Sequence, residues 1–353
     1  MRAGVTCRRV GHHGGMRDGL VVVGGSAGAV PPLIELVAGL PSDFAGCVLV
    51  TLHMPGHATS SLAAILDRAG PLPAVPAHDG APMVPGRIVV AVPDSHLLVA
   101  DGILRLGRGP RVNRHRPAVD VTFTGAAAWG GQAVTAVVLS GVLDDGAVGA
   151  ALVDASGGRV VIQDPEQAEH RAMPEAALRA VPAATVSPTA KLAEVVSAMA
   201  RDSGSTTSDR SSGAPPPEDP SPVAEAARAA GDPSAAGPDM AAGSDPAFLT
   251  PAESRLTRIS CPECQGPLAE MSAGNVTYYR CHIGHQYGLE TLVAAQADAV
   301  ESKLWVAVAA LEEQATMARH LAERGVDPAT HRATADSAAE LAGDLRARLR
   351  HPS

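Results

Sequence analysis

Short apolar runs alternate with segments of helical character between residues 19 and 200. The apolar runs are GLVVVG, GCVLVTL, RIVVAV, TAVVLS and GRVVIQ; a helix start at Pro31-Pro32 and the segment SSLAAILDRAG fall between them, and HLLVADGILRL has the form of a hairpin. Each run is rich in Val and nearly continuous, which is typical of strands buried on both faces. This βαβ rhythm predicts an α/β domain over residues 19–200, with a parallel sheet and flanking helices.

The pattern changes after this predicted domain. Residues 201–253 consist mainly of Ser, Gly, Pro, Ala and Asp, and they contain few large apolar side chains to offset the entropy of ordering. They predict a disordered linker. A Cys/His segment follows at residues 254–290, and apolar positions at steps of three and four then predict a helical hairpin over residues 291–350.

The composition limits the classes of function. The 353 residues suggest two or three domains at about 150 residues each. Lys plus Arg total 28 against 37 for Asp plus Glu, and this net charge of −9 argues against a nucleic-acid partner. No apolar run reaches the roughly 18 residues that span a bilayer, so we expect no membrane insertion and a cytoplasmic location. Residues 1–18 are expected to be a disordered extension, with Met16 as an alternative start.

A turn of small residues follows the first predicted strand. Gly24-Gly25-Ser26-Ala27-Gly28 lies between this strand and a helix, the context in which a serine side chain stands exposed on a sharp turn. The N–H groups of such a helix N-terminus lie where a developing oxyanion would be held. The pentad alone is equally consistent with a ligand-binding or structural turn. Its spacing fits neither the dinucleotide fingerprint G-x-G-x-x-G nor a P-loop.

A candidate general base follows the second predicted strand. His53 lies at the end of that strand, which in a parallel sheet reaches the same edge as Ser26. A hydrolytic role for Ser26 needs such a base within hydrogen-bond reach. His57, His96 and His115 are the alternative bases.

Candidate acids follow a later strand. Asp144 and Asp145 come after TAVVLS, again at the carboxyl end of a strand, and a carboxylate there would orient the base. Acids beside a glycine also serve as helix caps, and Asp145 directly precedes Gly146. Taken alone, either acid is better explained as a cap.

Taken together, these segments resemble the catalytic domain of the chemotaxis protein-glutamate methylesterases, the CheB-like family. The matching segments are VVVGGSAGAV, LHMPGH, VPDSHLLV, HRPAVDVTF, LSGVLDDGA and QDPEQAEHRAMPEAAL, in the family's order and spacing. The resemblance implies a Rossmann-like α/β fold and a triad of Ser26, His53 and Asp145, since the family's acid immediately precedes a glycine. It implies a carboxylic ester hydrolase that converts glutamyl γ-methyl esters of chemoreceptor-like proteins to glutamate and methanol, with no cofactor for catalysis. In this family the same chemistry also removes ammonia from glutamine side chains, so deamidation is a second activity that the resemblance allows.

The chain also departs from the family pattern. The expected oxyanion donors are backbone N–H groups, at Ala27 by the elbow rule and at Val142 by the resemblance. The family's acid loop often reads Gly-Met-Gly-Asn-Asp-Gly, whereas residues 141–146 read Gly-Val-Leu-Asp-Asp-Gly, which changes the backbone near Val142. Family members in chemotaxis usually carry an N-terminal receiver domain, for which the stretch before residue 19 is too short. We therefore expect any regulator to act in trans.

Five arginines gather in the segment RLGRGPRVNRHR. They are Arg105, Arg108, Arg111, Arg114 and Arg116. We expect them either to attract an acidic receptor helix to the active-site edge or to form a solvated loop, and the sequence favours neither.

Cys261, Cys264, Cys281 and His285 have the spacing of two metal-binding knuckles, with two, sixteen and three residues between successive ligands. Four such ligands suit tetrahedral Zn²⁺ in a zinc-ribbon-like module, with reduced thiols as the alternative. Protein fills all four positions, so the expected zinc is structural. His282 is the alternative fourth ligand.

The leading hypothesis is a methylesterase whose C-terminal module and hairpin recruit a partner or the substrate. One alternative is a catalytically weak regulatory or binding module that acts through the zinc-ribbon tail. Another is an esterase for small esters. If the catalytic and metal domains are independent, chelation should release residues 255–290 without abolishing chemistry at Ser26.

Overall fold

The computed structural model describes residues 19–205 and 255–350, with the exception of residues 45, 58 and 101. The extension expected at residues 1–18 lies outside the described residues. The linker expected at residues 201–253 also lies outside them from residue 206 onwards.

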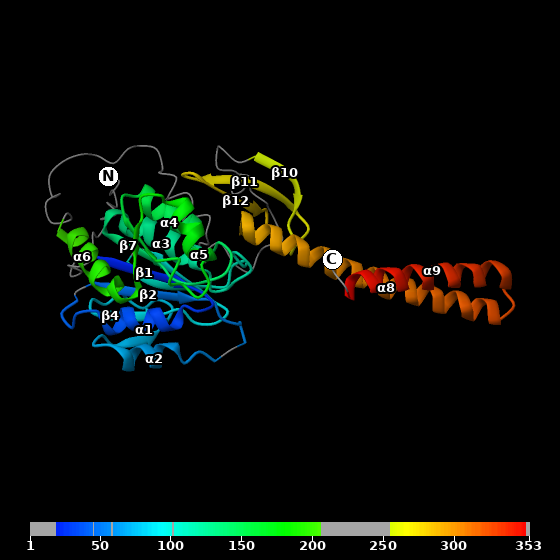
Figure 1. Cartoon of the computed structure of the whole chain (residues 1–353), viewed down its shortest axis with the longest axis horizontal. Coiled ribbons are helices and arrows are strands. Elements are labelled where there is room, and N and C mark those ends of the chain that lie inside the picture. The colour runs from blue at the N-terminus through cyan, green and yellow to red at the C-terminus, as the bar shows by residue number, and fades with distance from the viewer. Residues whose placement is uncertain (1–18, 45, 58, 101, 206–254, 351–353) are drawn as a thin grey trace, which may run out of the picture. The chain divides into compact units, whose positions relative to one another are not determined.

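Seven parallel strands form the central sheet, in the order β3-β4-β2-β1-β7-β8-β9 (Figure 1). The strands are β1 (Leu20–Gly25), β2 (Cys47–Leu52), β3 (Ala74–Pro76), β4 (Arg87–Val90), β7 (Val134–Val138), β8 (Arg159–Gln163) and β9 (Thr185–Ser187). All residues of the three central strands are buried, as the nearly continuous Val-rich runs predict. The predicted parallel sheet is confirmed.

Six helices cover the two faces of this sheet (Figure 1). They are α1 (Val30–Ala38), α2 (Leu62–Ala69), α3 (Val119–Gly130), α4 (Ala147–Ala155), α5 (Ala172–Ala180) and α6 (Leu192–Ser205). Side chains of α1, α2 and α6 form one apolar cluster with the sheet, and side chains of α3, α4 and α5 form the other. Helix α1 begins at the predicted prolines, which suit the first turn because their missing N–H groups have no partner there in any case. The arrangement confirms the Rossmann-like α/β fold.

Two smaller elements complete this part of the structure. The predicted hairpin is present as β5 (His96–Ala100) paired antiparallel with β6 (Ile103–Gly107). Two 3-10 helices span Gly131–Ala133 and Thr189–Lys191.

A second, antiparallel sheet contains the Cys/His segment. Its strands are β10 (Arg255–Ser260), β11 (Pro267–Ala273), β12 (Val276–Cys281) and β13 (Gln286–Gly288). Met271, Ala273 and Tyr278 belong to the apolar cluster that contains α3 and α4. This sheet and the first turn of the next helix, residues 255–291, are called the Cys/His module below, and they lie in the same compact unit as the catalytic domain.

The second compact unit, Leu292–Ser353, is the predicted helical hairpin. It contains most of α8 (Leu289–Glu323) and all of α9 (Pro328–Arg350). Small buried residues, among them Ala315, Ala318 and Ala338, line its interior, and Arg346 forms an ion pair with Glu312. Within the described residues, no helix combines the length and the apolar character that crossing a bilayer requires.

Candidate active site

Three loops meet at the carboxyl edge of the central sheet. Gly25 at the end of β1 lies beside Leu52 at the end of β2, so Ser26 and His53 are the next residues on neighbouring strands. Strand β7 lies on the other side of β1, and the loop that carries Asp145 follows it. Parallel strands therefore deliver all three predicted residues to one edge.

Ser26, His53 and Asp145 form a continuous chain of hydrogen bonds. Ser26 Oγ lies 3.0 Å from His53 Nδ1, and His53 Nε2 lies 2.6 Å from Asp145 Oδ2. The side chains of His53 and Asp145 are 6% and 2% exposed. With Asp145 ionised, Nε2 carries the ring proton and Nδ1 accepts from the serine hydroxyl, so the arrangement can remove a proton from Ser26.

The carboxylate of Asp145 is buried but receives many hydrogen bonds. Burial by itself raises the pKa of this carboxyl, but hydrogen bonds from His53 and Asn113 and the charge of His53 outweigh burial and hold the pKa well below its ordinary value. Backbone N–H groups of Val119, Asp120 and Gly146 also donate to it. The group is therefore an anion whose position is fixed from several directions.

Two residues beside the triad were missed at the sequence level. Asn113 donates from Nδ2 to both Asp145 Oδ1 and Asp120 Oδ2, at 2.8 Å each. Asp120 is fully buried, and burial together with the charge of Asp145 raises its pKa well above the ordinary value. For Asp120, the sequence offers one clue, because the residue lies within the family-like segment HRPAVDVTF. For Asn113 it offers none, because the residue lies among arginines in a segment that is equally consistent with a solvated loop.

The alternative bases lie in different environments. The ring of His115 stacks on that of His53, with the ring centroids 3.5 Å apart. Burial, and then the charge of His53, lowers the pKa of His115 to about 4, so this ring is neutral near pH 7. His96 is buried, 3.0 Å from the carbonyl oxygen of Pro110, and His57 is exposed. Among the four histidines, His53 is the one that the structure places between Ser26 and an acid.

The neighbouring acid, Asp144, has a separate set of contacts. Its carboxylate accepts from the backbone N–H of Glu290 at 2.9 Å, from that of Thr291 at 3.2 Å and from the Thr291 hydroxyl. Asp144 therefore caps α8. Helix capping is the alternative role that the sequence analysis gives for these two acids. Burial raises its pKa, and the hydrogen bonds from Thr291 and Glu290 oppose this effect.

The backbone around Ser26 is tightly packed. The Ser26 N–H donates to the carbonyl of Ser140 at 2.9 Å. A Cβ on Gly141 would lie 2.1 Å from Met173 Sδ and 2.9 Å from Ser26 Cβ, so a side chain at this position would displace the candidate nucleophile. The expected oxyanion donors lie on either side of these contacts, with Ala27 exposed and Val142 41% exposed.

The arginine segment is divided between internal pairs and exposed side chains. Arg116 donates to Asp94, and this contact holds the pKa of Asp94 below its ordinary value. Arg105 lies 3.8 Å from Asp79. Three further members are at least partly exposed, namely Arg108, Arg111 and Arg114.

The predicted metal ligands converge in the Cys/His module. One ligand atom from each of Cys261, Cys264, Cys281 and His285 lies within 4.8 Å of the others. Sγ of Cys264 and Sγ of Cys281 are 3.5 Å apart, and Nδ1 of His285 is 3.7 Å from Cys261 Sγ and 3.4 Å from Cys281 Sγ. A tetrahedral zinc with bonds of about 2.0 to 2.3 Å requires separations of about 3.3 to 3.8 Å between ligand atoms, and the three distances above fit this range.

The fourth position of this cluster is occupied by His285. Its Nε2 lies 3.2 Å from Glu263 Oε2, the arrangement in which a carboxylate orients a metal-binding imidazole. The alternative ligand, His282, is exposed and its ring lies against Gly266.

Comparisons with known proteins agree with the fold of residues 19–200. Residues 21–196 match the family model described as CheB methylesterase. A protein-glutamate methylesterase/protein-glutamine glutaminase of Hahella chejuensis is 36% identical over 183 residues, 51% of this chain and 50% of that protein. One from Caulobacter vibrioides is 38% identical over 186 residues, 51% of this chain and 54% of that protein. The chain thus spans about half the length of these curated relatives.

A solved structure covers the same region. The CheB methylesterase catalytic domain of Thermotoga maritima is 33% identical, with a TM-score of 0.50, and the match covers 51% of this chain and 98% of that domain. The family match, the sheet order and the arrangement of Ser26, His53 and Asp145 coincide in one part of the molecule. The chain therefore belongs to the CheB methylesterase family.

Proposed function

We propose that the protein hydrolyses glutamyl γ-methyl esters on a protein substrate, with Ser26 as nucleophile, His53 as general base and Asp145 as orienting acid. The observation that carries this proposal is the hydrogen-bonded chain from Ser26 Oγ through His53 to Asp145 at 3.0 and 2.6 Å. The relatives carry the name of this activity. The buried hydrogen bonds on Asp145 support its role, because they keep the acid ionised and stationary.

The reaction would proceed in two stages. His53 takes the hydroxyl proton as Ser26 Oγ bonds to the ester carbon, and the tetrahedral intermediate collapses by expelling methanol, which receives the proton from His53. A water that loses a proton to His53 then attacks the acyl-enzyme, and the glutamate side chain leaves as Ser26 regains its proton. N–H groups of Ala27 and Val142 are proposed to hold the oxyanion, each contributing about 2.7 to 4 kcal/mol.

The same residues would also support deamidation. Attack of Ser26 on a glutamine side chain gives the same acyl-enzyme, with ammonia leaving in place of methanol. The names of the relatives combine both activities. We propose deamidation as a second activity of the same site.

A methylated chemoreceptor or a similar protein is the proposed substrate, and the cytoplasm is the proposed location. Arg108, Arg111 and Arg114, each at least partly exposed, follow the β5–β6 hairpin, in the same segment as His115, which stacks on His53. Their positive charge would attract an acidic helical surface towards the site.

The Cys/His module is proposed to hold one structural Zn²⁺ through Cys261, Cys264, Cys281 and His285. Their separations fit a tetrahedral ion, and four protein ligands leave no position for a substrate water. The metal would stabilise the module, and catalysis would use no cofactor.

The test is methanol release from a methylated receptor cytoplasmic fragment by the purified full chain. Ser26→Ala should lower the rate by at least about 10⁴-fold, because it removes the nucleophile. The matched control is Ser60→Ala at an exposed serine, which should keep wild-type activity. A small methyl ester assayed in parallel distinguishes a general esterase, which would hydrolyse both substrates. If neither wild type nor Ser26→Ala releases methanol while both bind the fragment, the binding-module alternative replaces this proposal.

A further inference from the structure

Asn113 connects the acid of the triad to the Cys/His module. Its amide group donates to Asp145 Oδ1 and Asp120 Oδ2, while its carbonyl oxygen accepts from the N–H of Gly288 at 2.7 Å. Its backbone N–H donates to the carbonyl of Gln286 at 2.8 Å. The residue is 1% exposed, and both its amide protons and its carbonyl are used. One end of Asn113 therefore contacts the triad and the other end contacts β13 of the module.

Asp144 forms a second connection beside the first. It directly precedes Asp145 in the chain and accepts hydrogen bonds from Glu290 and Thr291, which follow β13. The contact surface leaves little room, because a Cβ on Gly288 would lie 2.3 Å from Asp144 Oδ2 and 2.6 Å from its Cγ. The acid loop and the module are thus joined by short polar contacts that tolerate no extra atom.

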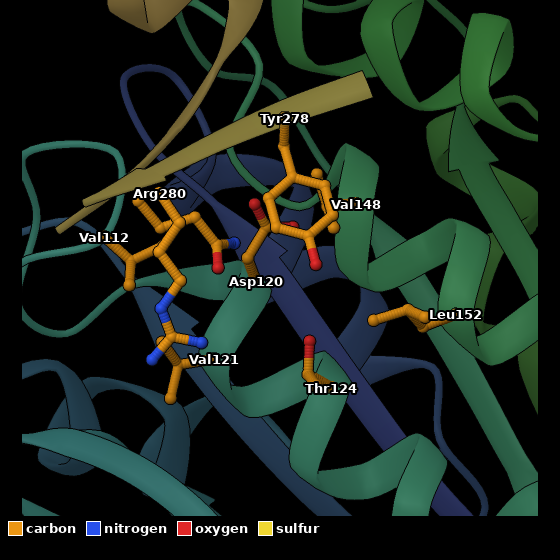
Figure 2. A pocket seen from close by; sticks show the side chains of 9 residues that line it. Val112, Asp120, Val121, Thr124, Val148, Leu152, Tyr278 and Arg280 are labelled. Atoms are coloured by element: carbon orange, nitrogen blue, oxygen red, sulfur yellow. The ribbon is translucent and has the colours of Figure 1, made fainter. Parts of the chain in front are cut away.

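Apolar contacts continue this interface away from the triad. Tyr278 belongs to the same apolar cluster as Val148 and Leu152 of α4. Figure 2 shows a small pocket beside them, where Tyr278 and Arg280 of β12 lie opposite Asp120 and Thr124 of α3. Burial lowers the pKa of Arg280 from its ordinary value. The module therefore covers Asp120, the carboxyl group that shares Asn113 with the triad acid.

The metal-ligand cluster adjoins the strands that make these contacts, because Cys281 ends β12 and His285 directly precedes β13. The Cys281 N–H donates to the His285 carbonyl at 3.0 Å, closing the second knuckle, and β13 begins at the next residue, Gln286. Strand β13 pairs with β12 through Arg280 and Gln286. Closing the knuckle around a metal would therefore fix the strand that presents Gln286 and Gly288 to Asn113.

We propose that Asn113 is a positioning residue for Asp145 and that the docked Cys/His module holds it in place, so that metal binding in the module controls the rate of chemistry at Ser26. This inference rests on the proposed function and deepens it by naming an internal regulator of the site. It replaces the expectation from sequence that chelation leaves Ser26 chemistry intact.

Two single substitutions break the connection at its two ends in the full chain. Asn113→Asp keeps the size of the side chain, the acceptor for Gly288 and tolerance of the positive φ of 50°. It replaces the two N–H donors to Asp145 and Asp120 by a carboxyl group, which carries at most one proton. Gly288→Ala adds one methyl group against Asp144 while leaving the amino-acid sequence of the catalytic domain unchanged, so it disturbs the acid loop from the module side. The matched control is Gly343→Ala, where an added Cβ meets nothing within 4 Å.

The main readout is the rate at which a fluorophosphonate labels Ser26. In this reaction Ser26 Oγ bonds to phosphorus, fluoride leaves and His53 takes the hydroxyl proton, so the rate reports the triad without the natural substrate. A second readout is the low-field proton resonance of the His53–Asp145 hydrogen bond. Methanol release supplies kcat and KM, and circular dichroism checks folding.

We expect Asn113→Asp to lower labelling and kcat by about 10- to 100-fold with KM nearly unchanged, because a hydrogen bond to a buried charge is lost. Gly288→Ala should also lower the labelling rate and kcat, and it should weaken the low-field resonance. Gly343→Ala should match wild type in all three. Chelation should slow the wild type, added Zn²⁺ should restore it, and chelation should slow Gly288→Ala far less, because the connection is already broken.

Opposite results are equally informative. Wild-type labelling rates in both folded variants would overturn the inference, as would equal slowing of wild type and Gly288→Ala by the chelator. Labelling without methanol release would refute the proposed substrate while leaving this connection intact. Absence of both in the wild type would refute the proposed function itself.

Discussion

Replacing Asp145 by Asn tests the core of the proposed site, because the change alters one atom at the most densely hydrogen-bonded side chain beside Ser26. The two carboxylate oxygens receive five N–H donors. Oδ2 faces His53 Nε2 and the N–H of Val119, and Oδ1 faces Asn113 Nδ2 and the N–H groups of Asp120 and Gly146.

Neither orientation of the new amide satisfies these donors. With its NH₂ group in the Oδ1 position, the substituted side chain would face three N–H donors. With NH₂ in the Oδ2 position, it would face Val119 and donate to His53 Nε2, which would place the ring proton on Nδ1, opposite Ser26. The second orientation leaves only the Val119 N–H unsatisfied, against three donors in the first, so it is the favoured one. An unsatisfied buried donor costs about 1 to 3 kcal/mol, and the free energy of unfolding should fall by about that amount. The wrong tautomer should lower kcat by about 10⁴-fold.

The assay combines methanol release with denaturant unfolding. Asp43→Asn is the control, because it makes the same change at an exposed carboxylate outside the site. The control should keep wild-type activity. An Asp145→Asn protein that is folded and retains a tenth of wild-type kcat would show that Asp145 does not orient His53.

Two further predictions concern pH and metal. The pKa of His115 is about 4 in the folded protein, against an ordinary value of 6.5. Between these two values the unfolded chain binds a proton at His115 that the folded chain does not bind. The free energy of unfolding should therefore fall by about 3 kcal/mol as the pH drops from 8 to 4. His115→Gln should flatten this part of the stability curve measured by denaturant unfolding, whereas a change at exposed His57 should not, and a curve unaltered by His115→Gln would contradict the assignment. Cys281→Ser should abolish stoichiometric zinc binding, measured by atomic emission, because one of four ligands is lost, while Cys47→Ala outside the cluster should retain it. Full zinc content in Cys281→Ser would exclude the proposed site.

Much of the fold could be predicted from the strand pattern, whereas the triad also needed the family resemblance, which selects Asp145 over Asp144. Nearly continuous Val-rich runs separated by helices indicate parallel strands buried on both faces, and parallel strands bring their carboxyl ends to one edge. Ser26, His53 and Asp145 each follow such a strand, but their convergence also depends on the strand order, which places β2 and β7 on the two sides of β1. The structure places them within hydrogen-bond distance of one another.

The supporting residues could not be predicted because they depend on loops that meet only in the folded chain. Asn113 lies 32 residues before Asp145 and adopts a positive φ, and its neighbours in sequence are arginines that suggest a solvated loop. His115 is one of three alternatives to His53 that the sequence leaves open, and the stacking of the two rings shows its place. Sequence spacing likewise left the fourth metal ligand open between His282 and His285, which the ring positions distinguish.

Hydrogen bonds to Asp144 connect the acid loop to the Cys/His module. In sequence, Asp144 stands where the family's loop often has Asn, which reads as a local departure. In the structure, its carboxylate accepts hydrogen bonds from Glu290 and Thr291, which lie 146 and 147 positions further along the chain at the N-terminus of α8. These hydrogen bonds oppose the effect of burial on the pKa of the Asp144 carboxyl, and they link the acid loop to the module. The family match ends at residue 196, so it includes Asp144 but not Glu290 and Thr291. Dividing the chain by sequence into independent catalytic and metal domains separates Asp144 from its partners, whereas the hydrogen bonds favour a catalytic domain whose acid loop is completed by the C-terminal module.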